Sequence, residues 1–208
     1  MKNIPALDSK VLDLVTEISK EPKVEAAMAF IKDQTEVAMQ EQIELCEIEA
    51  PTFHEEKRAA SVAERMKQYG LTDVHIDEIG NVIGIRKGTG SGPVLAIGAH
   101  MDSVFPTGTD VKVKKEGNIY RAPGIGDNCS GLRALLQVLR AMEKEDIRTV
   151  GDIWFVGTVG EEGNGDIRGS KHLCANNKLD GFVAIDSTDV GRVLYGAVGS
   201  HRWRLAVD

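Results

Sequence analysis

The stretch VLAIGAHMD, residues 94–102, is an apolar run that ends in a histidine and an aspartate. Residues two apart on an extended strand project to the same face, so His100 and Asp102 are expected to point in one direction at the strand end. One of them can bind a metal ion while the other orients it. An isolated His-x-Asp is more often a simple hydrogen-bonded pair, so its meaning depends on what the rest of the chain places beside it.

Two further apolar runs also end in acidic residues. The run DIWFVGTVG, residues 152–160, is nearly continuous in apolar residues, as in a strand covered on both faces, and it leads into Glu161 and Glu162. The run GFVAID, residues 181–186, ends in Asp186. Taken alone, the paired glutamates would be a solvated loop and Asp186 a turn residue with its carboxylate in water.

A fourth acidic residue, Asp127, lies in the glycine-rich turn APGIGDNCSG, residues 122–131, directly before a helical pattern. By itself it would be a helix N-terminal acid that stabilises the exposed amides there. The helix is expected from Ser130 to about Glu143, with an apolar face that packs on a sheet. Turns of this kind also leave side chains available for function.

Strand-like and helical segments alternate along the chain, which predicts an α/β fold with a mixed sheet and helices on both faces. A helical extension is expected over residues 1–48. Within it, apolar residues recur at three and four positions from Val24 toward Cys46, as in one amphipathic helix. The spacing of Thr52 and Glu55 predicts a capping box that opens the next helix.

Two hairpins are predicted from short alternating segments. The first joins DVHID to NVIGIRK around Gly80 and Asn81. The second, VKVKKEGNIYRAP, returns the chain to Asp127.

Strand ends in an α/β sheet line one crevice, so the acidic and imidazole side chains are expected to meet there. Crowded carboxylates resist ionising together unless cations neutralise them. One histidine with several carboxylates suits two divalent ions about 3.5 to 4 Å apart, with zinc as the first candidate and manganese or cobalt as alternatives. The candidate ligands are His100, Asp127, Glu161, Glu162 and Asp186.

In this order, the motifs resemble the dinuclear-zinc exopeptidase and deacylase family. That family includes glutamate carboxypeptidase, tripeptide aminopeptidase, aminoacylase and succinyl-diaminopimelate desuccinylase. The resemblance runs from about Gln42 to the end of the chain. It rests on APTFHEEKRAA, IDEIGNVIG, HMDSV, GIGDNCSG, GTVGEEGNGDIRGS and AIDSTDVGRVLYGAVGS.

The resemblance implies a zinc-exopeptidase-like catalytic domain and a division of labour among the metal ligands. His100 and Asp186 would bind one ion, Glu162 would bind the other, and Asp127 would bridge both.

The resemblance also implies the catalytic residues. Asp102 would orient His100. Glu161 would act as the general base that activates water for attack on an amide carbonyl, and would then protonate the leaving amine. The implied activity is hydrolysis of small peptides by an exopeptidase or dipeptidase, for which carboxypeptidase is one direction. The alternatives are an N-acyl amino acid deacylase or desuccinylase, or a metal-binding module without turnover.

The resemblance further implies how the chain is divided. Residues 1–196 correspond to the N-terminal part of the catalytic domain, and residues 197–208 to the first strand of an inserted lid and dimerisation domain. The family's last ligand, a histidine in a C-terminal segment, has no counterpart before Asp208, and His201 is expected to be an exposed strand residue. We therefore expect the N-terminal portion of a longer enzyme, with little activity alone and with homodimerisation through the lid.

Bulk properties limit the partners and the compartment. A formal net charge of -7 at pH 7 argues against nucleic acid or an anionic membrane as a partner, so a small peptide or an N-acyl amino acid is expected instead. Cys46, Cys129 and Cys174 are widely separated, which favours a reducing compartment. The start MKNIPALDSK lacks the apolar core of a signal peptide. Cytoplasm is the predicted location.

Overall fold

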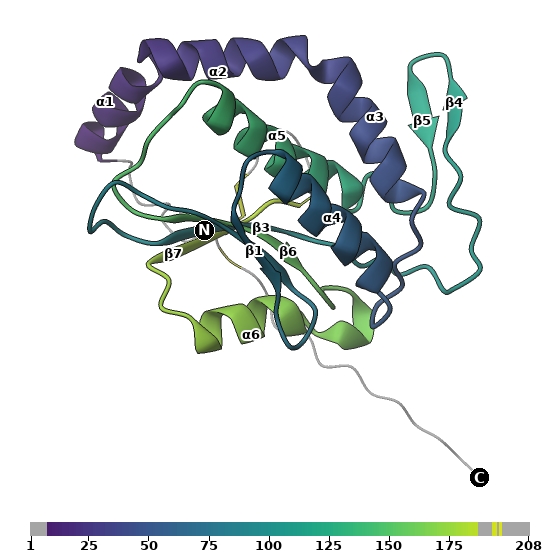
Figure 1. Ribbon diagram of the computed structural model, residues 1–208. Helices are drawn as coiled ribbons and strands as arrows, with labels where there is room; N and C mark the ends of the chain where they lie inside the picture. The colour runs from purple at the N-terminus through teal and green to yellow at the C-terminus, as the bar shows by residue number, and fades with distance from the viewer. Residues whose placement is uncertain (1–7, 187–192, 195, 197–208) are drawn as a thin grey trace, which may run out of the picture.

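The computed structural model describes residues 8–186, 193, 194 and 196, and its centre is a five-stranded mixed sheet with the strand order β1-β2-β6-β3-β7 (Figure 1). Strands β3, β6 and β7 run parallel, and β1 and β2 run antiparallel at one edge. The predicted mixed sheet is confirmed. Its strands are β1 (Asp73–Ile76), β2 (Val82–Arg86), β3 (Leu95–His100), β6 (Ile153–Thr158) and β7 (Gly181–Ala184).

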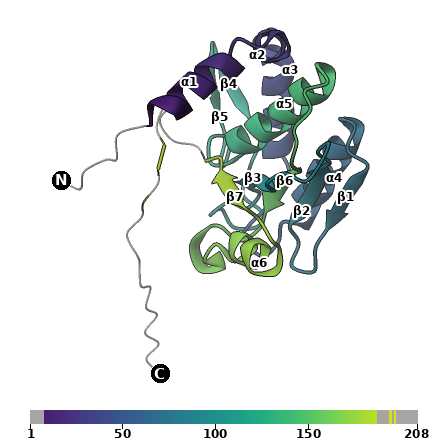
Figure 2. The ribbon, with the colours of Figure 1, turned by 90° about the vertical axis from the view of Figure 1, so that its left-hand side faces the viewer.

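Helices cover both faces of this sheet, as predicted. Helices α4 and α5 lie on one face and α6 on the other, and Figure 2 shows the same layers from the side. Helices α2 and α3 form a further layer over α5. The bounds are α1 (Ser9–Ile18), α2 (Pro22–Asp33), α3 (Thr35–Cys46), α4 (Glu56–Gln68), α5 (Cys129–Lys144) and α6 (Arg168–Asn176).

Strand β6 lies at the centre of the sheet and contributes to the core on both faces. Successive residues of a strand point to opposite faces. Phe155 therefore packs with Leu135 and Leu136 of α5, whereas Val156 packs with Leu173 of α6. The nearly continuous apolar run is explained by this double burial.

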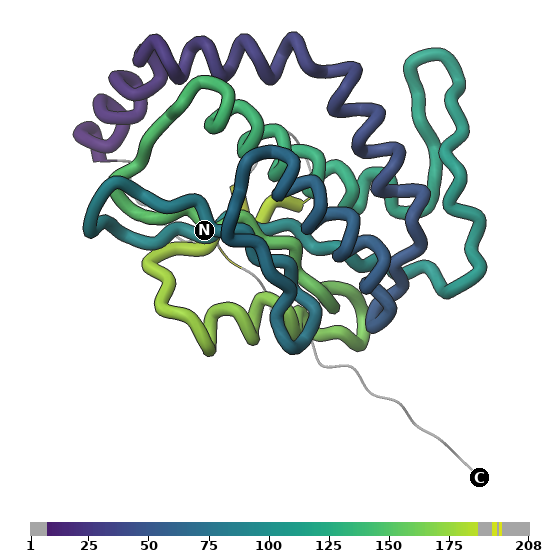
Figure 3. Tube along the Cα trace, in the orientation of Figure 1, coloured from purple at the N-terminus to yellow at the C-terminus, as the bar shows by residue number. Residues whose placement is uncertain are grey.

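Both predicted hairpins form. Strands β1 and β2 pair antiparallel through Ile76 and Val82. Strands β4 (Lys114–Glu116) and β5 (Ile119–Arg121) form a separate two-stranded sheet that stands apart from the main one in Figure 3. The chain leaves β5 directly into the turn that carries Asp127.

The single amphipathic helix predicted from Val24 toward Cys46 is wrong, because the structure divides it at Gln34. The Gln34 backbone leaves helical geometry, with φ −90° and ψ 13°. The Thr35 hydroxyl donates to the carbonyl oxygen of Lys32, a local hydrogen bond of the kind that interrupts or bends helices. The bend lets α3 change direction and run down toward α4 (Figure 3).

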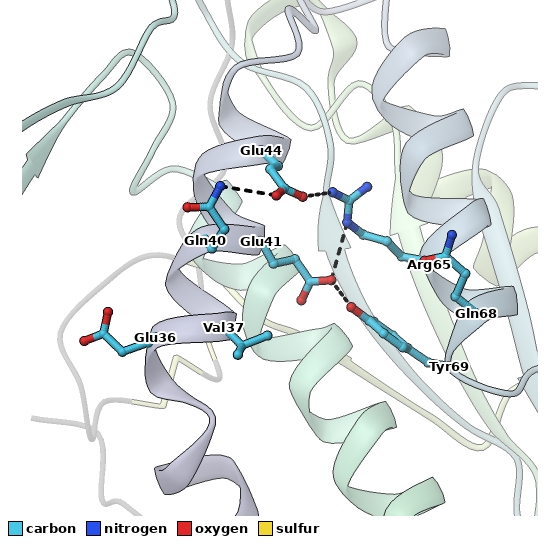
Figure 4. Close-up of a pocket in the computed structure, with 8 residues that line it drawn as sticks. All are labelled: Glu36, Val37, Gln40, Glu41, Glu44, Arg65, Gln68 and Tyr69. Atoms are coloured by element: carbon cyan, nitrogen blue, oxygen red, sulfur yellow. Dashed lines mark hydrogen bonds and ion pairs between the residues drawn. The ribbon is translucent and has the colours of Figure 1, made fainter.

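Polar contacts join α3 to α4 across a surface groove of about 540 Å³, shown in Figure 4. The buried Glu41 carboxylate accepts a hydrogen bond from the hydroxyl of Tyr69, and its Oε1 lies 3.4 Å from Nε of Arg65. Arg65 also donates to Glu44 at 2.7 Å. This groove holds none of the five candidate ligands, so its contacts stabilise the helix layer rather than the site.

Tyr69 is expected to titrate far above an ordinary tyrosine. Burial, followed by its hydrogen bond to Glu41, raises the pKa of Tyr69 from 10.0 to about 12. Because the folded pKa is raised, the stability that Tyr69 contributes is fully present below pH 10 and is lost as the pH rises toward 12. Tyrosinate absorbance of the wild type minus that of Tyr69→Phe should show this transition. A difference curve centred at pH 10 would contradict it.

Some expectations fall outside the described residues. Residues 197–208, predicted as the first lid strand, and His201 within them are not described, so the proposed division at residue 196 stays a prediction. Among the helices that the structure describes, none is long and apolar enough to cross a membrane.

Candidate metal centre

The register of the parallel strands brings distant residues to one edge of the sheet. His100 at the end of β3 pairs with Thr158 at the end of β6, so the turn that follows Thr158 starts beside His100. Gly98 pairs with Ala184 of β7, which places Asp186, two residues later, at the level of His100. The carboxyl ends of these strands therefore form one polar edge.

At this edge the candidate side chains lie within reach of one another. Nε2 of His100 is 3.0 Å from Oδ1 of Asp127 and 3.8 Å from Oδ1 of Asp186. His100, Asp127 and Glu162 each offer a ligand atom, and these three atoms lie within 4.8 Å of one another. The His100 side chain is 3% exposed, whereas Asp127 and Asp186 are 59% and 47% exposed. The group is thus anchored in the core and open to solvent.

Asp102 is completely buried, and its carboxylate contacts more than His100. Its Oδ1 is 3.5 Å from Nδ1 of His100. The same oxygen accepts a hydrogen bond from the backbone N–H of Glu161 at 2.9 Å, and Oδ2 accepts from that of Glu162 at 3.0 Å. One carboxylate therefore joins the end of β3 to the turn that carries both glutamates.

The predicted capping box at Thr52 and Glu55 does not form. The Thr52 hydroxyl donates to Oδ2 of Asp102 at 2.9 Å, and Glu55 accepts the backbone N–H of Gly160 at 3.0 Å. Across the described residues, no side chain caps the start of α4. A hydroxyl gains more from a charged carboxylate than from a neutral backbone group, so the tertiary partner wins.

Asn128 performs the helix-capping function that was the simple alternative for Asp127. The Asn128 side-chain oxygen accepts the N–H of Gly131 at 3.0 Å and so caps α5. Its amide nitrogen donates to the carbonyl oxygen of Ile185 at 2.9 Å. Asp127 is thereby left to face His100. Asn128 also links the α5 turn to the chain just before Asp186.

Arg58, on α4, fixes the backbone beside the site from within the core. Its guanidinium is 1% exposed and donates to the carbonyl oxygen of Met101 at 2.7 Å. Further bonds reach the carbonyl oxygen of Leu45, in the last turn of α3, and that of Ile48, just beyond its end. A buried guanidinium with backbone acceptors is well satisfied, and here it holds the residue between His100 and Asp102.

The electrostatics of the cluster favour a cation. Burial alone lowers the pKa of His100, but its negative neighbours Asp102 and Asp186 outweigh burial and raise that pKa to about 10. Burial acts to raise the pKa of Asp102, but hydrogen bonds from His100, two backbone amides and a hydroxyl lower it to about 2. The cluster therefore holds a proton on imidazole where a metal ion would otherwise supply positive charge.

The pKa values of the two glutamates also indicate that the cluster favours a nearby cation. Burial is the largest cause that raises the pKa of Glu161 and of Glu162, and neighbouring carboxylates add to it. One imidazole and several carboxylates, together short of positive charge, are a donor set that fits zinc, manganese or cobalt. His100, Asp127, Glu162 and Asp186 would hold such ions.

A cavity of about 310 Å³ adjoins the cluster on the α6 side of the sheet. Its ionisable lining residues are His100, Glu161 and Asp186. Its remaining wall is mostly apolar and includes Ile167 and Phe182. A small substrate group could therefore lie directly beside Glu161.

Imidazole and carboxylates at the carboxyl edge of a mixed sheet place this chain in the class of α/β proteins with a candidate metal centre at the strand ends. A tripeptidase from Staphylococcus aureus subsp. aureus Mu50 has a crystal structure that superposes with a TM-score of 0.60 at 31% identity, over 73% of this chain and 43% of that one. Residues 96–198 match the profile of Peptidase family M20/M25/M40, and this part of the chain belongs to that family.

Two curated relatives extend the similarity. A Pyrococcus abyssi protein with the provisional name LysW-lysine/LysW-ornithine hydrolase is 34% identical over 120 residues, which are 58% of this chain and 32% of that protein. The uncharacterized protein YqjE of Bacillus subtilis is 28% identical over 183 residues, 81% of this chain and 48% of that protein. The chain thus spans about a third to a half of the length of these two relatives.

Sequence reasoning identified the residues that meet at the sheet edge but missed those that hold them. The spacing of Thr52 and Glu55 indicates a local cap, and the position of Asn81 indicates a hairpin turn. Asn81 in fact accepts the N–H of Val159 at 3.1 Å. Asn128 lies in the segment GIGDNCSG, and the sequence predicts no role for it. Only their polar character near a glycine-rich turn could have indicated them, because their partners are distant in sequence.

Proposed function

We propose that this chain carries the site of a metal-dependent hydrolase that cleaves small peptides from one end. The observation that supports the proposal most is the placement of His100, Asp127 and Glu162, whose ligand atoms lie within 4.8 Å of one another, beside a cavity lined by Glu161. The match of residues 96–198 to a peptidase family and the likeness to a tripeptidase support the same proposal.

The residues would share the work as follows. His100 and Asp186 would hold one divalent ion, Glu162 a second, and Asp127 would contact both. Bound ions of this kind supply a lowered water pKa, toward about 7, and polarise a carbonyl. We propose zinc at both positions.

Glu161 would move the proton. Its carboxylate lines the cavity with His100 and Asp186, so a carboxylate oxygen can take a proton from water and return it to the departing amine nitrogen. Asp102 would keep the Nε2 face of His100 toward the ions through its contact at Nδ1, as carboxylates commonly do for ligating histidines.

A deacylase is the second candidate, and the names of curated relatives favour it. The Pyrococcus abyssi relative and an N-carbamoyl-L-amino-acid amidohydrolase of a Pseudomonas species, 30% identical over 135 residues, carry names of hydrolases other than peptidases. We further propose a cytoplasmic location, from the cysteine pattern, and homodimerisation through a lid domain. Both rest on the sequence.

The test compares blocked substrates on the purified, natural-length protein. Chelator treatment should abolish cleavage of an unblocked tripeptide, and zinc should restore it. Loss of cleavage on N-acetylation would indicate an aminopeptidase, and loss on C-terminal amidation a carboxypeptidase. Cleavage of N-acetyl amino acids alone would establish the deacylase. Protein that carries bound zinc yet cleaves none of these substrates would contradict the proposal.

A further inference from the structure

The turn from Val159 to Glu162 has all four of its consecutive backbone N–H groups bound by side-chain oxygens. Val159 donates to Asn81 at 3.1 Å and Gly160 donates to Glu55 at 3.0 Å. Asp102 accepts the next two, as described above. This turn carries Glu161, the proposed general base, and Glu162, a proposed ligand.

Glu55 is the least expected of these acceptors. Its side chain is 4% exposed, although glutamates are almost never buried without a partner. Its Oε1 accepts N–H groups from both Gly160 and Phe53, at 3.0 and 3.1 Å. Its Oε2 lies 3.3 Å from Nη2 of Arg168. The carboxylate is thereby paired and hydrogen-bonded, as a buried charge requires.

Arg168, the first residue of α6, holds the same turn from the other side. Its backbone N–H donates to the carbonyl oxygen of Gly160 at 3.1 Å, and its Nη1 donates to that of Ile79 at 2.9 Å. A Cβ on Gly160 would come within 2.5 to 2.9 Å of the Arg168 side chain, and Gly160 has φ +60°. Glycine is therefore required where Glu55 and Arg168 enclose the turn.

Phe53 shows that the arrangement is held under strain. It has φ +76°, a conformation that is unfavourable for a bulky residue. Its N–H is bound by Glu55, and its ring lies 5.3 Å from the Arg168 guanidinium. Strained backbone persists where surrounding contacts over-determine it, and it concentrates at functional sites.

We propose that Glu55, paired with Arg168, is a positioning residue that fixes Gly160 and thereby sets where Glu161 and Glu162 point. The inference rests on the function proposed above for those glutamates. The Glu55 carboxylate does not cap α4, although it stands at the start of that helix. Its bonds converge instead on the turn and on the residue that encloses it.

The experiment compares Glu55→Ala with Glu56→Gln, a control on the exposed neighbour. Amide hydrogen exchange of residues 159–162 reports the turn directly, and calorimetric titration with zinc reports its ligand. In Glu55→Ala, exchange should rise at least about tenfold, and zinc affinity should fall about 10- to 100-fold, the usual cost of losing a residue that supports a ligand. Glu56→Gln should leave both unchanged.

Conservative variants separate positioning from folding. Glu55→Gln keeps an oxygen for Gly160 and Phe53 but turns an uncharged amide toward Arg168, so it should rescue most of the exchange protection. Arg168→Lys keeps the charge without the two-pronged geometry and should raise exchange moderately. These two variants decide the matter if Glu55→Ala does not fold.

Two outcomes are kept apart by this design. Unchanged exchange in a folded Glu55→Ala protein, or in both conservative variants if it does not fold, would overturn the positioning role. Absence of zinc binding by the wild type would instead defeat the proposed function, while the exchange comparison would still decide whether Glu55 holds the turn.

Discussion

Replacement of Glu161 by glutamine is expected to lower kcat/KM for a small peptide by about a thousandfold, within the range for loss of a general base. Glutamine has nearly the same shape but cannot take a proton from water. Glu161 lines the cavity beside His100 but lies outside the triad of His100, Asp127 and Glu162. Zinc content should therefore stay at the wild-type value.

The measurement pairs steady-state kinetics with metal analysis of the same sample. Glu25→Gln, on the exposed surface of α2, is the matched control and should keep full turnover. Undiminished turnover in Glu161→Gln would reject the assigned base. Loss of zinc along with turnover would show that Glu161 is a ligand instead.

Replacement of Asp127 by asparagine is expected to remove at least one metal ion per chain and to lower turnover by about a thousandfold or more. Asp127 lies 3.0 Å from His100 and is proposed to contact both ions. Asparagine offers one neutral oxygen in place of two that share a negative charge, so it cannot bridge two cations. The loss should therefore exceed that of an ordinary ligand.

Metal content after extensive dialysis, measured by mass spectrometry, tests this expectation. Asp33→Asn, at the exposed end of α2, is the control and should retain the wild-type stoichiometry. If Asp127→Asn kept two ions, Asp127 could not be the bridge. Another carboxylate would then have to bridge the two metal ions.

The sheet and its helices could be predicted because their signals are local and repeated. The run before Glu161 is apolar on both faces since β6 is covered by α5 and α6. The kink at Gln34 could not be predicted from the sequence, because the apolar periodicity continues through it. Only the hydrogen bond from the Thr35 hydroxyl to the carbonyl oxygen of Lys32 marks the break.

The site divides in the same way. His100 and Asp186 could be expected together because parallel strands with helical crossovers bring their carboxyl ends to one edge. Thr52 could not be placed, since its spacing to Glu55 satisfies a local capping rule, and the choice between a nearby amide and Asp102 is made only after folding. Side chains that support a site have partners far away in sequence, and the spacing of residues along the chain does not predict such partners.

The double use of Asn128 limits how this protein can be altered. The oxygen of its side-chain amide caps α5, and the nitrogen donates a hydrogen bond to the backbone just before Asp186. Aspartate, which also suits a helix start, offers only acceptors, and serine or threonine carries its donor and its acceptor on one oxygen. A search for heat-tolerant variants is therefore expected to find no replacement here, because a residue that still caps the helix would release the backbone beside Asp186 in the proposed metal centre.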